Sequence, residues 1–154
     1  MQTITLHDKQ FKPFISEQEL DDAVTRMANQ VAHDLGDEVP VFVGILNGSF
    51  MIVSDFVKKY PKPCEVTFIK LASYEGVKST EDIQRLIGLT QDLTGRTVVI
   101  LEDIIDTGNT LEEVHRIFKS ENVKQLLIAT LFYKPEAYKK DFKLHYVGIE
   151  IPNK

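Results

Sequence analysis

The stretch that decides the fold of this 154-residue chain is VVILEDIIDTGNT, residues 98–110. It opens with an apolar run, so that residues 97–101 predict a strand buried on both faces of a sheet. After the turn, apolar residues return at helical spacing and predict an amphipathic helix that begins near Leu111. A strand, a tight turn and a helix in this order form the repeating unit of an α/β fold.

The rest of the chain repeats this alternation. We predict further helices over residues 16–36 and 50–60, and further strands over residues 41–46, 65–71, 125–132 and 144–149. The strands are apolar throughout and lack an in/out alternation, which indicates a mostly parallel, twisted sheet of about five strands with helices on both faces. The composition does not shift along the chain, so we expect residues 1–154 to form a single domain.

The connection over residues 72–92 differs from its neighbours. It is polar, has little apolar periodicity and lies between two predicted strands. A polar connection of this length within one domain is usually functional or mobile. We therefore expect a functional or mobile segment here.

Composition limits the classes of partner. The net charge of −5 argues against a basic nucleic-acid surface but is compatible with a phosphate ligand, which backbone amides and a bridging cation can hold. The single Cys64 has no partner for a disulfide or a zinc cluster, which suits a reducing cytosol. The N-terminus is too polar for a signal peptide, and no apolar run reaches membrane length. We expect a cytoplasmic protein with no nucleic-acid or membrane partner.

The turn after residues 97–101 has features that are typical of a phosphate-binding site. The strand delivers Glu102 and Asp103 to the carboxyl edge of the sheet, where ligands of open α/β sheets bind. Gly108 allows a positive φ, and Thr107 and Thr110 add hydroxyl donors beside the free N–H groups of the helix start. These features suit one phosphate monoester, with the acidic residues matching ribose hydroxyls.

An ordinary helix start is the simpler alternative. We expect Thr110 and Glu113 to form a capping box there. That cap leaves Glu102, Asp103 and Asp106 crowded at one strand end, where repulsion is unfavourable without a cation or hydroxyl donors, although a solvated loop tolerates it. The chain contains neither a P-loop motif nor a dinucleotide fingerprint after a strand.

The stretch VVILEDIIDTGNTL resembles the ribose-phosphate signature of type I phosphoribosyltransferases, and most closely that of the hypoxanthine(-guanine) branch. Three further segments match that branch in order along nearly the whole chain. They are GILNGSF (44–50), similar to its pyrophosphate-binding turn; Ser73-Tyr74, similar to its lid; and Lys134 with GIEIPNK (148–154), similar to its base pocket. The resemblance implies the type I phosphoribosyltransferase fold, with a mobile lid around 72–92 and a small N-terminal hood.

The activity that the resemblance implies is purine salvage. Ribose 5-phosphate is transferred from phosphoribosyl pyrophosphate to hypoxanthine, with guanine as the second expected base, in a magnesium-dependent reaction that releases pyrophosphate. By the resemblance, Asp106 is the general base. Glu102 and Asp103 hold the ribose hydroxyls directly or through Mg²⁺. The 5′-phosphate is bound by the loop made of Asp106, Thr107, Gly108, Asn109 and Thr110.

The remaining roles also rest on the resemblance. Asn47 and Gly48 give backbone amides to pyrophosphate through a strained or cis peptide, although the local sequence alone favours a plain turn. Lys134 donates to the 6-oxo group of the base, a position that would otherwise be a solvated lysine. Ile104 offers an apolar face to the purine or belongs to the core. The lid residues Ser73 and Tyr74 close over pyrophosphate.

The chain departs from the family pattern at two places. Asn47 and Asn109 are amides where many relatives carry a basic residue, so phosphate binding depends more on magnesium. The sequence ends at Lys154, just before the position of the family's purine-stacking residue, and we expect the natural protein to be longer. These departures keep two alternatives open: a regulator that binds phosphoribosyl pyrophosphate without turnover, and a phosphoribosyltransferase for another base. The resemblance favours a homo-oligomer, a dimer or a tetramer.

Overall fold

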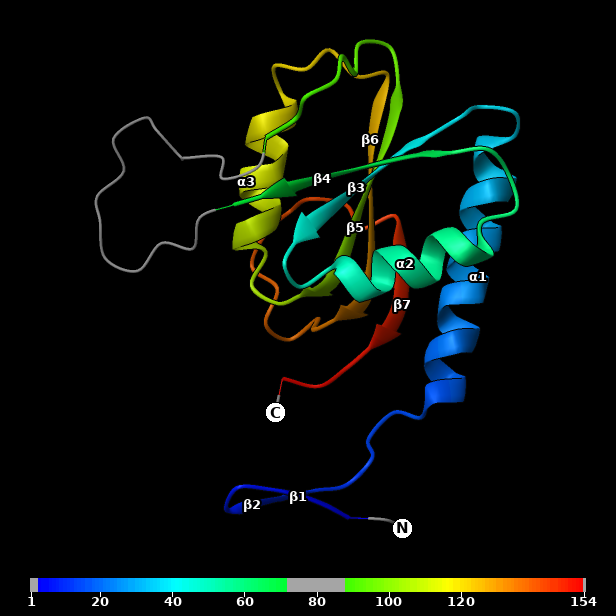
Figure 1. The fold of residues 1–154 in the computed structure, drawn as a ribbon. Coiled ribbons are helices and arrows are strands. Elements are labelled where there is room, and N and C mark those ends of the chain that lie inside the picture. Colours follow the sequence, from blue (N-terminus) through cyan, green and yellow to red (C-terminus); the bar gives the residue numbers. More distant parts are fainter. Residues whose placement is uncertain (1–2, 72–87, 154) are drawn as a thin grey trace, which may run out of the picture.

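A parallel sheet in the strand order β4-β3-β5-β6-β7 forms the centre of the computed structural model, which describes residues 3–71 and 88–153 (Figure 1). All neighbouring strands of this sheet are parallel. The strands are β3 (Val41–Leu46), β4 (Glu65–Lys70), β5 (Thr97–Ile105), β6 (Gln125–Tyr133) and β7 (Tyr146–Glu150). The predicted parallel sheet of about five strands is therefore confirmed.

The strand order reverses between β3 and β5. From β3 the chain moves outward to β4, whereas from β5 it moves the opposite way to β6 and β7. Pairing of Val41 with Val98 and of Gly44 with Leu101 sets β3 and β5 side by side. In open parallel sheets, ligands bind beyond the carboxyl ends of the two strands at such a reversal. The topology therefore places the residues after Leu46 and those at the end of β5 around one crevice.

Helices cover both faces of the sheet. Helices α1 (Glu17–Leu35) and α2 (Phe50–Lys59) lie on one face, and α3 (Asn109–Phe118) lies on the other (Figure 1). Each face has its own apolar core: Phe42, Phe56 and Met27 are fully buried on the first, and Ile100 and Leu111 on the second. Burial of apolar surface on both sides explains why the strands are continuously apolar.

Helix α1 has the ends that its sequence predicts. The Ser16 hydroxyl accepts a bond from the Glu19 amide at 3.1 Å, and the Glu19 carboxylate accepts one from the Ser16 amide at 2.7 Å. This capping box satisfies two otherwise free N–H groups. At the other end, Gly36 adopts a φ of 56°, which suits glycine and ends the helix.

The region from β5 to α3 corrects two predictions. Strand β5 continues to Ile105, because β6 runs alongside it and pairs Ile105 with Tyr133, so Glu102 and Asp103 lie within the strand. Helix α3 begins at Asn109, and its N-cap is Gly108. The predicted capping box of Thr110 and Glu113 is wrong, because Thr110 already lies inside the helix. The Glu113 carboxylate instead pairs with Arg116 at 2.6 Å.

The N-terminal residues form a separate hairpin of β1 (Ile4–Leu6) and β2 (Lys9–Phe11), where we predicted a small hood. It lies on the side of the sheet toward which the carboxyl ends of β5, β6 and β7 point (Figure 1). Of the predicted lid, residues 72–87 fall outside the described part, and residues 88–92 have no regular secondary structure. None of the helices in the described residues combines the length and the apolar character needed to cross a membrane.

Candidate active site

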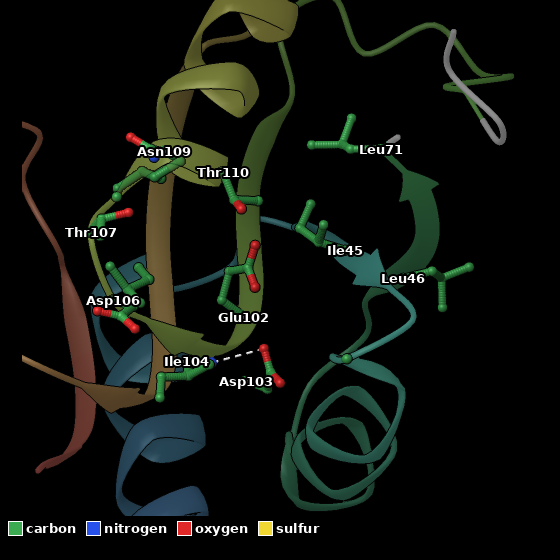
Figure 2. A pocket seen from close by; sticks show the side chains of 14 residues that line it. Ile45, Leu46, Leu71, Glu102, Asp103, Ile104, Asp106, Thr107, Asn109 and Thr110 are labelled. Atoms are coloured by element: carbon green, nitrogen blue, oxygen red, sulfur yellow. Dashed lines mark hydrogen bonds between the residues drawn. The ribbon is translucent and has the colours of Figure 1, made fainter. Parts of the chain in front are cut away.

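The crevice at the strand reversal holds a cavity of about 380 Å³ (Figure 2). Apolar side chains of Ile45 and Leu71 lie on one side, and the end of β5 with the loop before α3 lies on the other. The other lining residues are Leu46, Gly48, Glu102, Asp103, Ile104, Ile105, Asp106, Thr107, Gly108, Asn109, Thr110 and Leu111. All of the predicted ribose-phosphate residues therefore line one cavity.

Glu102 is the most buried charged residue in this cavity. Its side chain is 6% exposed, and its Oε1 atom has no hydrogen-bond partner in the described residues. Burial raises the pKa of the Glu102 carboxyl to about 8, and the neighbouring Asp103 carboxylate adds to the rise by its charge and by a hydrogen bond. A buried carboxyl oxygen without a partner can accept a hydrogen bond from a hydroxyl group or bind a cation.

We predict that Glu102→Gln stabilises the ligand-free protein at neutral pH. Because the folded-state pKa is raised from 4.5 to about 8, the contribution of Glu102 to stability is present below pH 4.5 and is lost as pH rises through 8. At pH 7 this loss amounts to about 3 kcal/mol, at 1.36 kcal/mol per unit. Glutamine carries no charge at any pH, so the variant avoids this loss of stability. Urea unfolding at several pH values should show a gain that shrinks toward pH 4.5, and Glu136→Gln, at an exposed position, serves as the control. A gain that does not depend on pH would contradict this account.

Asp103, near the end of β5, contacts the turn that follows β3. Its carboxylate accepts a bond from the Ile104 amide at 2.8 Å, as Figure 2 shows. Gly48 lies directly against it, since a Cβ atom at Gly48 would stand 2.7 Å from Asp103 Oδ2. The peptide bond between Leu46 and Asn47 is cis. The predicted pyrophosphate turn and the predicted ribose acids therefore touch, and a side chain at position 48 would displace the Asp103 carboxylate.

The loop before α3 forms the end of the cavity that suits an anion such as phosphate. Gly108 has a φ of 93°, the left-handed conformation that the sequence predicted, and it directs the chain into the helix. Thr107, Asn109 and Thr110 lie around the same opening (Figure 2). Free amides at the start of α3 point to this end, and the positive end of the helix dipole favours an anion there.

Asp106 and Lys134 lie together at the edge of the site. Lys134 Nζ stands 3.5 Å from Asp106 Oδ2, with the lysine side chain 22% exposed and the aspartate 50% exposed. The Lys134 amide also donates to the Ile105 carbonyl at 3.0 Å, which fixes its backbone beside the end of β5. Ile104 is half-buried and lines the cavity, and it belongs to neither apolar core. Its side chain is therefore available to a ligand.

A model of the phosphoribosyl transferase domain matches residues 16–154. The chain belongs to the phosphoribosyltransferase family. It is 38% identical to a hypoxanthine phosphoribosyltransferase of Salmonella typhimurium, an alignment that covers 90% of this chain and 80% of the relative. It is 35% identical to a hypoxanthine-guanine phosphoribosyltransferase of Staphylococcus epidermidis, over 90% and 78% of the two chains. A crystal structure of a hypoxanthine-guanine phosphoribosyltransferase from Bacillus anthracis superposes with a TM-score of 0.85 at 33% identity, over 94% and 83% of the two chains.

In this phosphoribosyltransferase, residues that the sequence analysis did not single out pack against the loop before α3. Tyr138 and Lys140 pack on Gly108, because a Cβ atom there would lie 2.7 Å from Tyr138 Cε2 and 2.7 Å from Lys140 Cγ. The Lys139 amide donates to the Thr107 carbonyl at 3.1 Å. These residues belong to a charged segment without apolar periodicity, which carried no local signal. The predicted lid residues Ser73 and Tyr74 lie outside the described residues.

Proposed function

We propose that this chain transfers ribose 5-phosphate from phosphoribosyl pyrophosphate to a 6-oxopurine, hypoxanthine first and guanine second, in purine salvage. The proposal rests on its family and on one observation above all, the pairing of Asp106 with Lys134 at 3.5 Å. One of these side chains accepts a proton and the other donates a hydrogen bond.

This pair suits one edge of the base. In a 6-oxopurine the imidazole nitrogen N7 and the oxygen O6 lie next to each other on the same edge. Asp106 is placed to accept the proton on N7, while Lys134 donates to O6. Adenine presents an amino group in place of O6, so its two donors would face the lysine ammonium. The pair therefore favours hypoxanthine and guanine over adenine.

The other residues act on the sugar donor. The bond between C1′ and the pyrophosphate oxygen breaks, the bond between C1′ and the purine N9 forms, and Asp106 takes the imidazole proton. The loop over residues 106–110 binds the 5′-phosphate through its amides, and Asn47 and Gly48 bind the pyrophosphate that leaves. Ile104 packs on the base, and Glu102 and Asp103 hold the ribose hydroxyls.

Mg²⁺ fits the same acids. Glu102 has an unpartnered buried oxygen beside the carboxylate of Asp103, and both are oxygen donors of the kind that Mg²⁺ prefers. Within the described residues no three metal-binding side chains come together, so the substrate and water would complete the coordination shell. When bound, Mg²⁺ would neutralise charge on the departing pyrophosphate.

The test is pyrophosphate release in the presence of Mg²⁺, phosphoribosyl pyrophosphate and one base at a time. We expect release with hypoxanthine and guanine and none with adenine or uracil. Calorimetric binding of phosphoribosyl pyrophosphate without release for any base would replace the proposal with a ligand-binding regulator. Release with uracil alone would assign another base.

We predict that Lys134→Gln lowers kcat/KM for hypoxanthine by roughly 10- to 100-fold, because a hydrogen bond from a charged donor contributes about 1.5–3 kcal/mol. The KM for phosphoribosyl pyrophosphate should change little, since Lys134 faces the base. Lys143→Gln removes the same charge from an exposed position of the same segment and is the matched control. Equal losses in both variants would show that net charge, and not the contact with the base, determines the rate.

A further inference from the structure

The phosphate loop has no cation of its own. Asn109 stands at its centre, and the nearby side chains of Glu102, Asp103, Asp106 and Glu112 are acidic. Lys134 is already paired with Asp106 at the base edge of the site. A phosphate carries about two negative charges at neutral pH. A positive charge from another part of the chain would therefore strengthen phosphate binding by the loop amides.

Lys140 is placed to supply it. Its Cγ atom would lie 2.7 Å from a Cβ atom at Gly108, so the stem of the lysine packs on the backbone of the loop. Its Nζ atom lies 2.7 Å from Glu112 Oε2, in the first turn of α3. The ammonium group therefore lies at the first turn of α3, and the lysine side chain is 25% exposed.

The segment that carries Lys140 is fixed to the loop. The Lys139 amide donates to the Thr107 carbonyl at 3.1 Å. The Tyr138 ring packs against Gly108, and its hydroxyl donates to the Phe142 carbonyl at 2.7 Å. The Phe142 ring stacks on His115 of α3, with ring centroids 4.0 Å apart. Backbone and ring contacts thus hold position 140 next to the loop, while the end of its flexible side chain can exchange one acidic partner for another.

We propose that Lys140 binds the 5′-phosphate of the sugar donor and that Glu112 holds its ammonium group while the site is free. This inference rests on the proposed function. Exposed ion pairs such as that of Lys140 with Glu112 add little to stability, whereas a lysine bonded to a phosphate forms a strong, charge-assisted bond. The exchange of partners therefore favours the phosphate. The buried Glu102 oxygen without a partner, in the cavity that residues 106–110 also line, is independent evidence that a ligand binds beside this loop.

Binding of ribose 5-phosphate, measured by calorimetry at low salt, tests the proposal without catalysis. We expect Lys140→Met to raise the Kd about tenfold, since an ammonium–phosphate contact is lost. Glu112→Gln should instead lower the Kd about two- to threefold, because it releases the lysine and removes a negative charge. Lys143→Met removes an equal charge from an exposed position of the same segment and should leave the Kd unchanged. Pyrophosphate alone should bind the wild type and Lys140→Met equally.

The opposite changes in Kd expected for the two variants distinguish a phosphate-binding lysine from one that only stabilises the fold. Both Lys140→Met and Glu112→Gln remove the same ion pair, so a merely structural pair would shift both values of Kd in the same direction, and that result would overturn the proposal. An unchanged Kd in Lys140→Met would also overturn it. If Lys140→Met fails to fold, Glu112→Gln alone decides by the sign of its effect. Absence of ribose 5-phosphate binding in a wild type that still releases pyrophosphate with hypoxanthine would overturn this inference and leave the proposed function standing.

Discussion

Replacement of Asp106 with asparagine should lower kcat for hypoxanthine by about 10²- to 10⁴-fold, the usual contribution of a positioned general base. Asparagine keeps the shape of the side chain and its reach toward Lys134, which lies 3.5 Å from Asp106. It loses the ability to take the imidazole proton. The loop amides that we propose to bind phosphate are unchanged, so the KM for phosphoribosyl pyrophosphate should stay within about threefold. Steady-state kinetics with each substrate varied in turn measure both constants.

A matched variant shows whether the loss comes from the position of the carboxylate or from its charge. Asp141→Asn removes the same charge from an exposed residue of the 134–145 segment and should leave kcat unchanged. If Asp106→Asn retained more than about a tenth of wild-type kcat, another group would have to accept the proton. If instead the KM for phosphoribosyl pyrophosphate rose as steeply as kcat fell, Asp106 would be a sugar-binding residue.

Local pattern was enough to predict the sheet but not the end of β5. Continuous apolar runs predicted each strand, because a strand buried on both faces leaves that mark in its own residues. Residues 102–105 are two acidic residues followed by two isoleucines, so the apolar run is interrupted at Glu102. These residues nevertheless adopt the strand conformation, because β6 pairs with β5 as far as Ile105 and Tyr133. The same pairing buries Glu102, so its raised pKa depends on tertiary contacts that the sequence does not display.

The site was predictable to different degrees. The loop at Gly108 has a local signature, since a positive φ, hydroxyl side chains and a helix start coincide there. Lys134 has no such signature, and only the family resemblance assigned it to the base. Its pairing with Asp106 at 3.5 Å is seen in the structure alone. Tyr138 and Lys140 were missed because contacts with the backbone of a distant loop leave no periodicity in a charged segment.

Replacement of Gly108 with alanine should nearly abolish binding of the sugar donor. Gly108 has a φ of 93°, where a side chain costs about 1–2 kcal/mol. The new Cβ atom would also stand 2.7 Å from Tyr138 Cε2 and from Lys140 Cγ. The tyrosine ring cannot move aside freely, because its hydroxyl is bonded to the Phe142 carbonyl. The loop must therefore shift away from the segment behind it, and its amides no longer converge on the phosphate.

Each charge-assisted bond that is lost costs about 1.5–3 kcal/mol, so the KM for phosphoribosyl pyrophosphate should rise by at least about 100-fold. Gly95→Ala is a control that separates the effect of backbone strain from that of a steric clash with neighbouring side chains. Gly95 has a φ of 73°, but a Cβ atom there meets nothing within 4 Å. Gly95→Ala should lose about 1–2 kcal/mol of unfolding free energy and keep its KM. Gly108→Ala should lose more unfolding free energy, and its KM should rise. Equal kinetics in the two variants would mean that the loop tolerates displacement, and the phosphate would then have to bind through side chains and not through the amides of the loop.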